Sequence, residues 1–433
     1  MKNKFNKNWG WVVGLVLVVG IVGATGYVLG EKQNISGEGI KQETSQENKY
    51  LKFWTEVEEV TRKNYWNNLG DEEWNKLVTS LIEKITGRAV PASGEGKEAT
   101  KKVIRETLDL YEDEAKKKEF VTTLADSVLA SLEPANRSRL YLKKDEKALA
   151  DNVNNKTENN YYKDLGVAKE AKPQEVKSAY EKLEKELAPK SDTASKEKLE
   201  AAKRAVEVLG DEGNRQRYDT YSLDPTIVSR ELEGGVLYLK WSKFSPNSFN
   251  ELVAVTEKYK GKKGLNGLIV DLRDNVGGAI DGLSYFLGPF VGNDTLGYQF
   301  FLKGKKEDYL TKTGWLPGLV QYKKVVVLIN GQTQSTAEVM AGAIKKFNAG
   351  ILVGTKSKGW GTVERVFSLK NQLAENEIYS IFLVHRLTLR DDGQPIEGRG
   401  VEPVVNITSP SWESELGQYY EGRVMVEAVK SVL

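Results

Sequence analysis

The sequence predicts a multidomain protein of mixed α+β and α/β class, with a transmembrane helix, helical regions and an α/β core. An uncharged run, Trp9–Gly30, is long enough to cross a bilayer. Residues 50–150 and 160–222 show the three- and four-residue apolar spacing of helices. Across 226–433, short β-rich runs alternate with helical segments, which is typical of a partly parallel sheet.

Composition excludes several classes of function. The chain has 433 residues with 39% hydrophobic side chains, enough for two or three globular domains. Its net charge is only +2, so we expect no nucleic-acid partner. There is no cysteine and only one histidine, His385, which excludes disulfides, cysteine nucleophiles and histidine-rich metal sites. We expect neither a metal nor a cofactor.

The apolar run at 9–30 predicts a single membrane anchor. Lys2, Lys4 and Lys7 precede it, which places the N-terminus in the cytoplasm and the rest of the chain outside the cell membrane. Residues 31–49 are polar and are predicted to form a linker. The alternative is a cleaved signal peptide, for which Val22-Gly23-Ala24 is a poor cleavage site.

Two strand–turn–helix junctions carry the candidate chemistry. The stretch Asp271–Gly278, DLRDNVGG, ends in glycines that let backbone N–H groups face a ligand, as in an oxyanion hole. Ser335 stands between a predicted strand, Val325–Ile329, and a predicted helix ending at Phe347, so the helix N-terminus favours negative charge beside it. A simple turn and a serine N-cap are the structural alternatives.

Taken together, these motifs resemble one enzyme family. The region Leu237–Val405 is similar to the core of the carboxyl-terminal processing, or tail-specific, serine peptidases. The matching motifs are DLRDNVGG at 271–278, STAEVMAGA at 335–343, VGTKSKGWGTVE at 353–364 and GRGVEP at 398–403. The helical region resembles the helical N-terminal part of this family. The resemblance implies a core of the crotonase-like ββα type and polypeptide substrates, handled at their C-termini.

The resemblance also implies roles for individual residues. The nucleophile falls on Ser335, and the oxyanion donors on backbone N–H groups near Gly277 or Gly278 and of Thr336. The family's general base is a lysine between two glycines, which must act as a neutral amine. Here that position is Trp360, whose indole has no basic nitrogen.

This substitution leaves two hypotheses open. Lys358, in the same loop as Lys356, is a substitute base if its side chain reaches Ser335, with Glu364 orienting it. Otherwise the site is inactive, and the protein is a pseudoprotease that binds chain ends or acts as a scaffold. We interpret His385 as a structural residue of a strand, and Glu338 as a support for the helix turn.

The middle of the chain resembles a J domain, the cochaperone module of DnaJ-type proteins. The matches are Tyr161–Val167, Pro173–Tyr180, Ala205–Asp211 and Arg215–Asp219. The family's H-P-D tripeptide is replaced by Ala188, Pro189 and Lys190. We therefore expect no DnaK-type partner, although a true cochaperone is a third hypothesis. No segment resembles the family's peptide-binding PDZ domain, so the J-like block stands in its place as a spacer or docking module.

Overall fold

The computed structural model describes residues 48–89 and 97–433, and Asn48–Leu433 forms one compact unit. The predicted anchor at 9–30 lies outside the described residues. Within those residues, no helix has the length and apolar character needed to cross a membrane.

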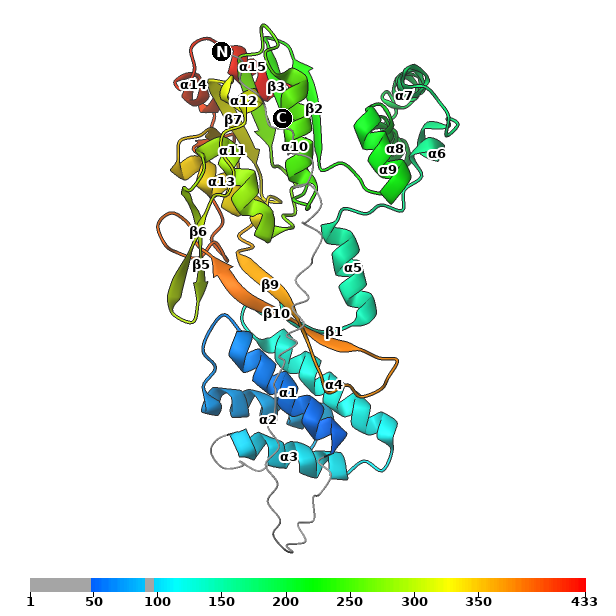
Figure 1. Ribbon diagram of the computed structural model, residues 1–433, viewed down its shortest axis with the longest axis vertical. Helices are drawn as coiled ribbons and strands as arrows, with labels where there is room; N and C mark the ends of the chain where they lie inside the picture. The colour runs from blue at the N-terminus through cyan, green and yellow to red at the C-terminus, as the bar shows by residue number, and fades with distance from the viewer. Residues whose placement is uncertain (1–47, 90–96) are drawn as a thin grey trace, which may run out of the picture. The chain divides into compact units, whose positions relative to one another are not determined.

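An N-terminal helical region comes first and packs on a long strand (Figure 1). Its helices are α1 (Lys49–Asn64), α2 (Asp71–Thr86), α3 (Lys97–Asp109), α4 (Glu114–Ser131) and α5 (Lys143–Val153). Fully buried Trp54, Val78 and Leu124 belong to a cluster that also contains Ile381 and Leu383 of strand β10 (Tyr379–Thr388). The apolar faces that predict these helices are therefore buried partly against a strand more than 200 residues later in the chain.

The J-like segment folds as a set of helices around its own small core. They are α6 (Tyr161–Leu165), α7 (Pro173–Leu187), α8 (Thr193–Leu209) and α9 (Glu212–Tyr221). Val176 of α7 and Ala202 of α8 are fully buried in this cluster. The Asp192 and Asp211 side chains cap α8 and α9 by accepting backbone N–H groups, which explains where both helices begin.

A five-stranded antiparallel sheet lies beside the helical region. Its strands are β1 (Arg139–Leu142), β5 (Leu296–Leu302), β6 (Lys305–Leu310), β9 (Thr362–Ser368) and β10. Strand β10 pairs with β1, β5 and β9, three segments distant from one another in sequence. The strand that contains His385 is the only part of this sheet predicted from the sequence. The β5–β6 hairpin was missed because β6, KKEDYL, is mostly charged and lies at an edge of the sheet.

The α/β core is built on a six-stranded sheet that is parallel except for one edge strand. Its order is β11 (Val405–Asn406), β8 (Ile351–Gly354), β7 (Lys324–Ile329), β4 (Gly267–Asp271), β3 (Val236–Trp241) and β2 (Ile227–Leu232). Only the β2–β3 pair is antiparallel. The partly parallel sheet predicted from sequence is therefore present.

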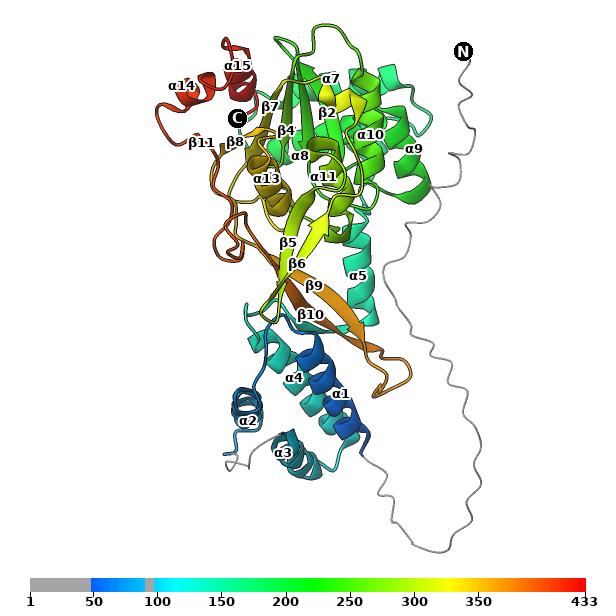
Figure 2. The same cartoon turned by 60° about the vertical axis from the view of Figure 1, so that its left-hand side comes forward.

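Helices cover both faces of this sheet (Figure 2). Alternating residues of β4 separate the two cores, since Leu268 and Val270 belong to one cluster and Ile269 to the other. The first face is covered by α10 (Ser248–Tyr259), α11 (Leu283–Val291), α12 (Pro317–Val320) and α13 (Thr336–Lys346). The second is covered by α14 (Trp412–Gly417) and α15 (Val424–Lys430). Because both faces of the strands are packed, the strands are fixed relative to one another. The candidate site is built on the ends of these strands.

Phe244 connects this core to the glycine turn. Its ring is fully buried, with its centroid 4.6 Å from Trp241 and 5.4 Å from Phe286. Its backbone N–H donates to Gly277 O at 2.8 Å, and its carbonyl oxygen accepts from Ala279 N at 2.7 Å.

We therefore expect Phe244→Ala to lower the free energy of unfolding by about 3–5 kcal/mol, because it leaves a cavity in a packed aromatic cluster. Urea unfolding followed by tryptophan fluorescence would measure the change. Tyr419→Ala is the matched control, since that ring is 49% exposed and its loss should cost less than about 0.5 kcal/mol. Equal effects of the two substitutions would contradict this description of the core.

Candidate active site

The candidate site lies where β4 and β7, neighbouring parallel strands, end at the same edge of the sheet. Strand β4 leads into the glycine turn at 272–278, and β7 leads into the turn that ends at Ser335. Parallel strands gather their loops at the carboxyl edge, where α/β proteins build binding sites. The two junctions singled out in the sequence therefore meet in space.

Asn275 holds the glycine turn in shape and joins it to the serine turn. Its side-chain amide donates to Trp241 O at 2.6 Å, and its Oδ1 accepts from Gly277 N at 2.8 Å. Its backbone oxygen accepts from Gln334 N, the residue before Ser335, at 3.0 Å. The D-L-R-D-N motif thus brings the two turns together with a buried asparagine.

Gly277 and Ser335 are in direct contact. A Cβ at Gly277 would lie 2.7 Å from Ser335 Cβ and 3.0 Å from Thr336 N, so no side chain fits there. Ser335 has φ +57° and ψ −126°, outside the regions that L-residues favour. Such strain is found mostly at functional sites, where the surrounding structure supports it. The close approach therefore sets a strained, half-buried serine against a turn that must be glycine.

Two backbone N–H groups beside Ser335 are candidates for binding an oxyanion. Gly277 N is not one of them, because it already donates to Asn275 Oδ1. Among the described residues, neither Gly278 N nor Thr336 N donates a hydrogen bond. Thr336 Oγ1 donates to Gly278 O at 3.0 Å, which ties the two residues together. Of the predicted donors, Gly278 and Thr336 therefore retain free N–H groups, and Gly277 has a supporting role.

The carboxylate of Glu338 fixes the start of α13 to the loop at 357–360. It is fully buried and accepts from Ser335 N at 2.9 Å, Ser357 Oγ at 2.6 Å, Gly359 N at 2.7 Å and Trp360 N at 2.8 Å. Burial raises the pKa of Glu338, and these hydrogen bonds oppose that shift. Glu338 supports the helix turn, as interpreted from the sequence, and also positions the loop that carries residue 360.

Trp360 is half-buried and stacked under a cation. The Arg137 guanidinium carbon lies 3.4 Å from the centre of its ring. Arg137 also donates to Thr362 Oγ1 at 3.0 Å and to Glu397 Oε1 at 2.9 Å. The second oxygen of Glu397 accepts from Gly361 N at 2.7 Å. An arginine from the segment after α4 thus clamps the tryptophan in place.

Lys358 also faces the tryptophan, at a greater distance. Its side chain is exposed, and its ammonium nitrogen lies 5.2 Å from the Trp360 ring centre. Its backbone N–H donates to Thr333 O at 3.0 Å, two residues before Ser335. Lys356 instead pairs with Glu402 at 3.0 Å. Within the part of the chain that the structure describes, Ser335 Oγ donates no hydrogen bond to a side-chain base.

Glu364 and His385 complete the set of predicted residues. Burial raises the pKa of Glu364, and hydrogen bonds from Thr362 and Trp360 oppose the shift. Glu364 is therefore beside Trp360, and its side-chain partners among the described residues include Thr362, Trp360 and Arg137. His385 Nδ1 pairs with Asn64 O of α1 at 2.6 Å, and burial lowers the pKa of the ring. His385 thus connects β10 to the end of α1, and Glu364 contacts the side chains next to it in the loop and strand.

The loop between α7 and α8 holds the altered tripeptide. Ala188 ends α7 in helical geometry, and Lys190 Nζ donates to Glu186 Oε1 at 3.2 Å. The lysine thus turns back onto its own helix as part of an exposed ion pair.

Sequence reasoning missed Arg137, Ser357 and Glu397. Arg137 lies outside every motif, so no local pattern could identify it. Ser357 and Glu397 lie within or beside motifs, but their polar contacts to Glu338 and Gly361 depend on the folded loop.

Comparison with known proteins finds two families in this chain. Residues 235–407 match peptidase family S41, and residues 160–219 match the DnaJ domain. The chain is 28% identical over 194 residues to the carboxy-terminal-processing protease of Bartonella bacilliformis, covering 44% of this chain and 43% of the relative. It is 30% identical over 191 residues to a probable CtpA-like serine protease of Staphylococcus epidermidis, covering 43% of this chain and 36% of the relative. The chain thus spans less than half the length of these relatives.

Solved structures are more distant. The photosystem II D1 C-terminal processing protease is 16% identical, with a TM-score of 0.44, covering 83% of this chain and 93% of that one. A lipoprotein from Streptococcus agalactiae is 15% identical, with a TM-score of 0.41, covering 83% of this chain and 99% of that one.

The family matches coincide with the parts of the chain that hold the Ser335 site and the J-like helices. The chain therefore contains a peptidase family S41 domain homologous to the carboxyl-terminal-processing proteases, preceded by a DnaJ domain.

Proposed function

We propose that this protein is a membrane-anchored, exported homologue of the carboxyl-terminal-processing proteases that binds polypeptide C-terminal segments at the Ser335 site and hydrolyses them very slowly. In this proposal its α/β core is of the crotonase-like ββα type. The oxyanion donors and the serine are kept, whereas the general base is replaced by Trp360. The protein thus acts as a pseudoprotease that holds chain ends.

The observation that carries this proposal is the stacking of the Trp360 ring against two cationic groups, Arg137 and Lys358. A serine is activated by a base that can take its proton. The indole offers none, and the side chains over its ring are the guanidinium of Arg137 and the ammonium of Lys358. Stacking on an arginine adds about 0.5–2 kcal/mol of attraction, which stabilises the tryptophan in this position. The site therefore has the features of a binding site more than those of a catalytic dyad.

A second candidate function is an active serine peptidase with Lys358 as a shifted base. The observation that favours it is the anchoring of Lys358 N to Thr333 O, which holds the root of this side chain near Ser335. The flexible lysine stem has several rotamers from that anchor. The Lys358 side chain is exposed, so activity through it would require its amine to fold back toward Ser335.

The membrane anchor and the J-like domain complete the proposal. The uncharged run at 9–30 with lysines before it supports a single span with an exported chain. Replacement of the H-P-D tripeptide by Ala188, Pro189 and Lys190 supports a docking or spacer role for the J-like helices. We propose that they hold the binding site at a distance from the membrane or dock a partner protein.

The decisive experiment is Trp360→Lys. A lysine there would stand beside Arg137, whose charge lowers the lysine pKa and favours the neutral amine that a base requires. We expect peptidase activity on unfolded protein substrates to rise about 100-fold or more over the parent protein, since a positioned base contributes about 10²–10⁴-fold. Release of fluorescent peptides from a labelled substrate would measure it.

Controls separate the two candidates. Trp360→Gln removes the ring without supplying an amine and should give no gain, and adding Ser335→Ala to Trp360→Lys should abolish the new activity. Activity of the parent protein that disappears with Lys358→Ala, reaction of its serine with a phosphonate probe and no gain from Trp360→Lys would together establish the shifted dyad.

For topology, we expect external protease to digest residues 31–433 in intact cells or spheroplasts, because lysines precede the apolar run and none lies within it. Immunoblotting with an antibody to the α/β core would follow the digestion. Complete protection of the core under conditions that digest a known exported protein would refute the proposed orientation.

For the J-like helices, we expect no stimulation of a DnaK-type ATPase by residues 48–433, because alanine and lysine replace the interacting side chains of the tripeptide. Steady-state phosphate release, with a functional J protein as the positive control, would test this. The double substitution Ala188→His and Lys190→Asp restores the tripeptide. Stimulation by this variant would show that the surrounding helices can still bind a DnaK-type chaperone. Clear stimulation by the parent protein would favour a true cochaperone.

A further inference from the structure

A short segment, residues 222–226, connects α9 to β2 and so joins the J-like helices to the α/β core. Side chains of the J-like helices contact this connection. Arg204 of α8 donates to Pro225 O at 2.7 Å, and its guanidinium lies 3.4 Å from Asp224 Oδ2. The connection is therefore held by the J-like helices as well as by the chain itself.

A buried carboxylate fixes the end of this connection to the core. Glu251, on helix α10, has a side chain that is only 3% exposed. Its Oε2 accepts hydrogen bonds from Thr226 N at 2.7 Å, from Thr226 Oγ1 at 2.8 Å and from Ile227 N at 3.0 Å. Glu251 thus binds the last residue of the connection and the first residue of β2 to α10.

Arg217 of α9 supplies positive charge to this carboxylate. Its Nε lies 3.9 Å from Glu251 Oε1, which is too far for a hydrogen bond. Its Nη2 donates to Asn214 Oδ1 at 2.5 Å, within the J-like helices. Burial raises the pKa of Glu251, whereas the charge of Arg217 and the hydrogen bonds from Thr226 oppose that shift. A J-like helix therefore helps to keep a buried carboxylate of the core ionised.

Thr226 is bonded in turn to both ends of the segment 242–248. Its carbonyl oxygen accepts from Ser242 N at 2.9 Å. Its hydroxyl, which donates to Glu251, also lies 2.7 Å from Ser248 Oγ. The place of Thr226 therefore determines the place of this segment.

Phe244, inside this segment, supports the glycine turn beside Ser335. It makes backbone hydrogen bonds to Gly277 and Ala279, and a Cβ at Gly278 would lie only 2.0 Å from Phe244 O. Gly278 carries one of the two free N–H groups described above. A donor stabilises an oxyanion only when it points at the place where the negative charge develops. A shift of Phe244 would therefore move a candidate oxyanion donor.

We propose that Arg217 and Glu251 are a positioning pair for the oxyanion turn. The charge of Arg217 keeps the Glu251 carboxylate bonded to Thr226, and the segment 242–248 then holds Gly278 beside Ser335. The J-like helices are thus part of the support of the site, in addition to a docking or spacer role. This inference deepens the proposed function and rests on it for the use of the turn as an oxyanion hole.

Hydrogen exchange measured by mass spectrometry tests the pair without any need for hydrolysis. The protein is residues 48–433, which form one compact unit. Arg217→Gln leaves a buried carboxylate without its cation, so we expect backbone amides in 242–248 and 275–279 to exchange about 10-fold faster. Unchanged exchange in both segments would overturn the proposal. Arg105→Gln, at an exposed arginine of α3, is the matched control and should change neither segment.

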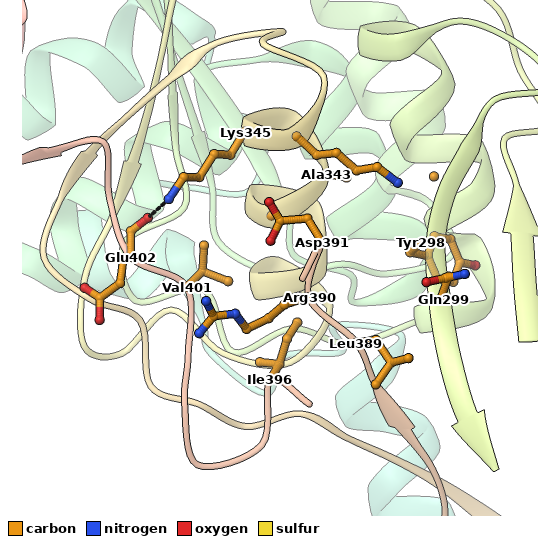
Figure 3. A pocket seen from close by; sticks show the side chains of 13 residues that line it. Tyr298, Gln299, Ala343, Lys345, Leu389, Arg390, Asp391, Ile396, Val401 and Glu402 are labelled. Atoms are coloured by element: carbon orange, nitrogen blue, oxygen red, sulfur yellow. Dashed lines mark hydrogen bonds between the residues drawn. The ribbon is translucent and has the colours of Figure 1, made fainter. Parts of the chain in front are cut away.

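A reference elsewhere in the core separates this local effect from loss of the fold. Leu389 and Ile396 line a small cavity bounded by β5, α13 and residues after β10 (Figure 3). Their backbone N–H groups donate to Gln299 O and Thr388 O, each at 3.0 Å. We expect exchange at these two amides to be the same in Arg217→Gln as in the parent protein.

Glu251→Gln distinguishes a charge pair from packing. A glutamine oxygen can still accept from Thr226, but it carries no charge and needs no cation. The double variant, Arg217→Gln with Glu251→Gln, should therefore exchange within about 2-fold of the parent in both segments. If the double variant exchanges as fast as Arg217→Gln, or does not fold, Arg217 acts by packing and the proposed pair is wrong.

Kinetics in the Trp360→Lys background test the effect on the oxyanion turn itself. Oxyanion donors act mainly in the transition state, so Arg217→Gln should lower kcat about 10-fold and leave KM within about 2-fold. Adding Glu251→Gln should restore kcat. A change in KM alone would mean that the pair acts on substrate binding, which would contradict the positioning role. If Trp360→Lys is inactive, the proposed function fails, and the exchange experiment still decides whether the pair supports the turn.

Discussion

The buried carboxylate of Glu338 is the group on which the geometry of the site depends. It accepts hydrogen bonds from the backbone N–H of Ser335, from the Ser357 hydroxyl, and from the backbone N–H groups of Gly359 and Trp360. A buried carboxylate without such partners would cost several kcal/mol, so helix and loop are held together as one unit. These contacts use backbone atoms at residues 359 and 360. The loop is therefore fixed regardless of which side chain stands at position 360.

Two positive groups, Arg137 and Lys358, lie over the ring at position 360. A catalytic lysine has to give up its proton, and nearby positive charge helps it to do so. At position 360 the positive groups are partners of an aromatic face, and Arg137 is held there by Glu397, with both side chains only 17% exposed. The same arginine links the segment after α4 to the loop at 360–362. Here the charge of Arg137 stabilises the ring of Trp360 through a cation–π contact.

Much of the core was predictable, because its signals are local. Strand β7 begins within one residue of the predicted strand and ends where predicted, helix α13 ends one residue before the predicted Phe347, and Ser335 stands at the predicted strand-to-helix junction. The antiparallel sheet was largely missed, since β10 pairs with three distant segments and the charged strand β6 lacks an apolar pattern. The Arg137–Trp360 stack and the engagement of Gly277 N by Asn275 depend on tertiary contacts between residues far apart or on turn geometry. Neither leaves a periodic trace in the sequence.

Binding and hydrolysis depend on different parts of this site, and their separation is physically reasonable. In the proposed function, a bound polypeptide would use the free N–H groups of Gly278 and Thr336, which do not involve the side chain at position 360. Rate acceleration depends on interactions that are stronger in the transition state than in the bound substrate, and proton transfer to a base is one of these. In the proposed function, the side chain at position 360 would therefore determine most of the rate and little of the affinity. Under the proposed function, the protein would hold chain ends and cut them very slowly.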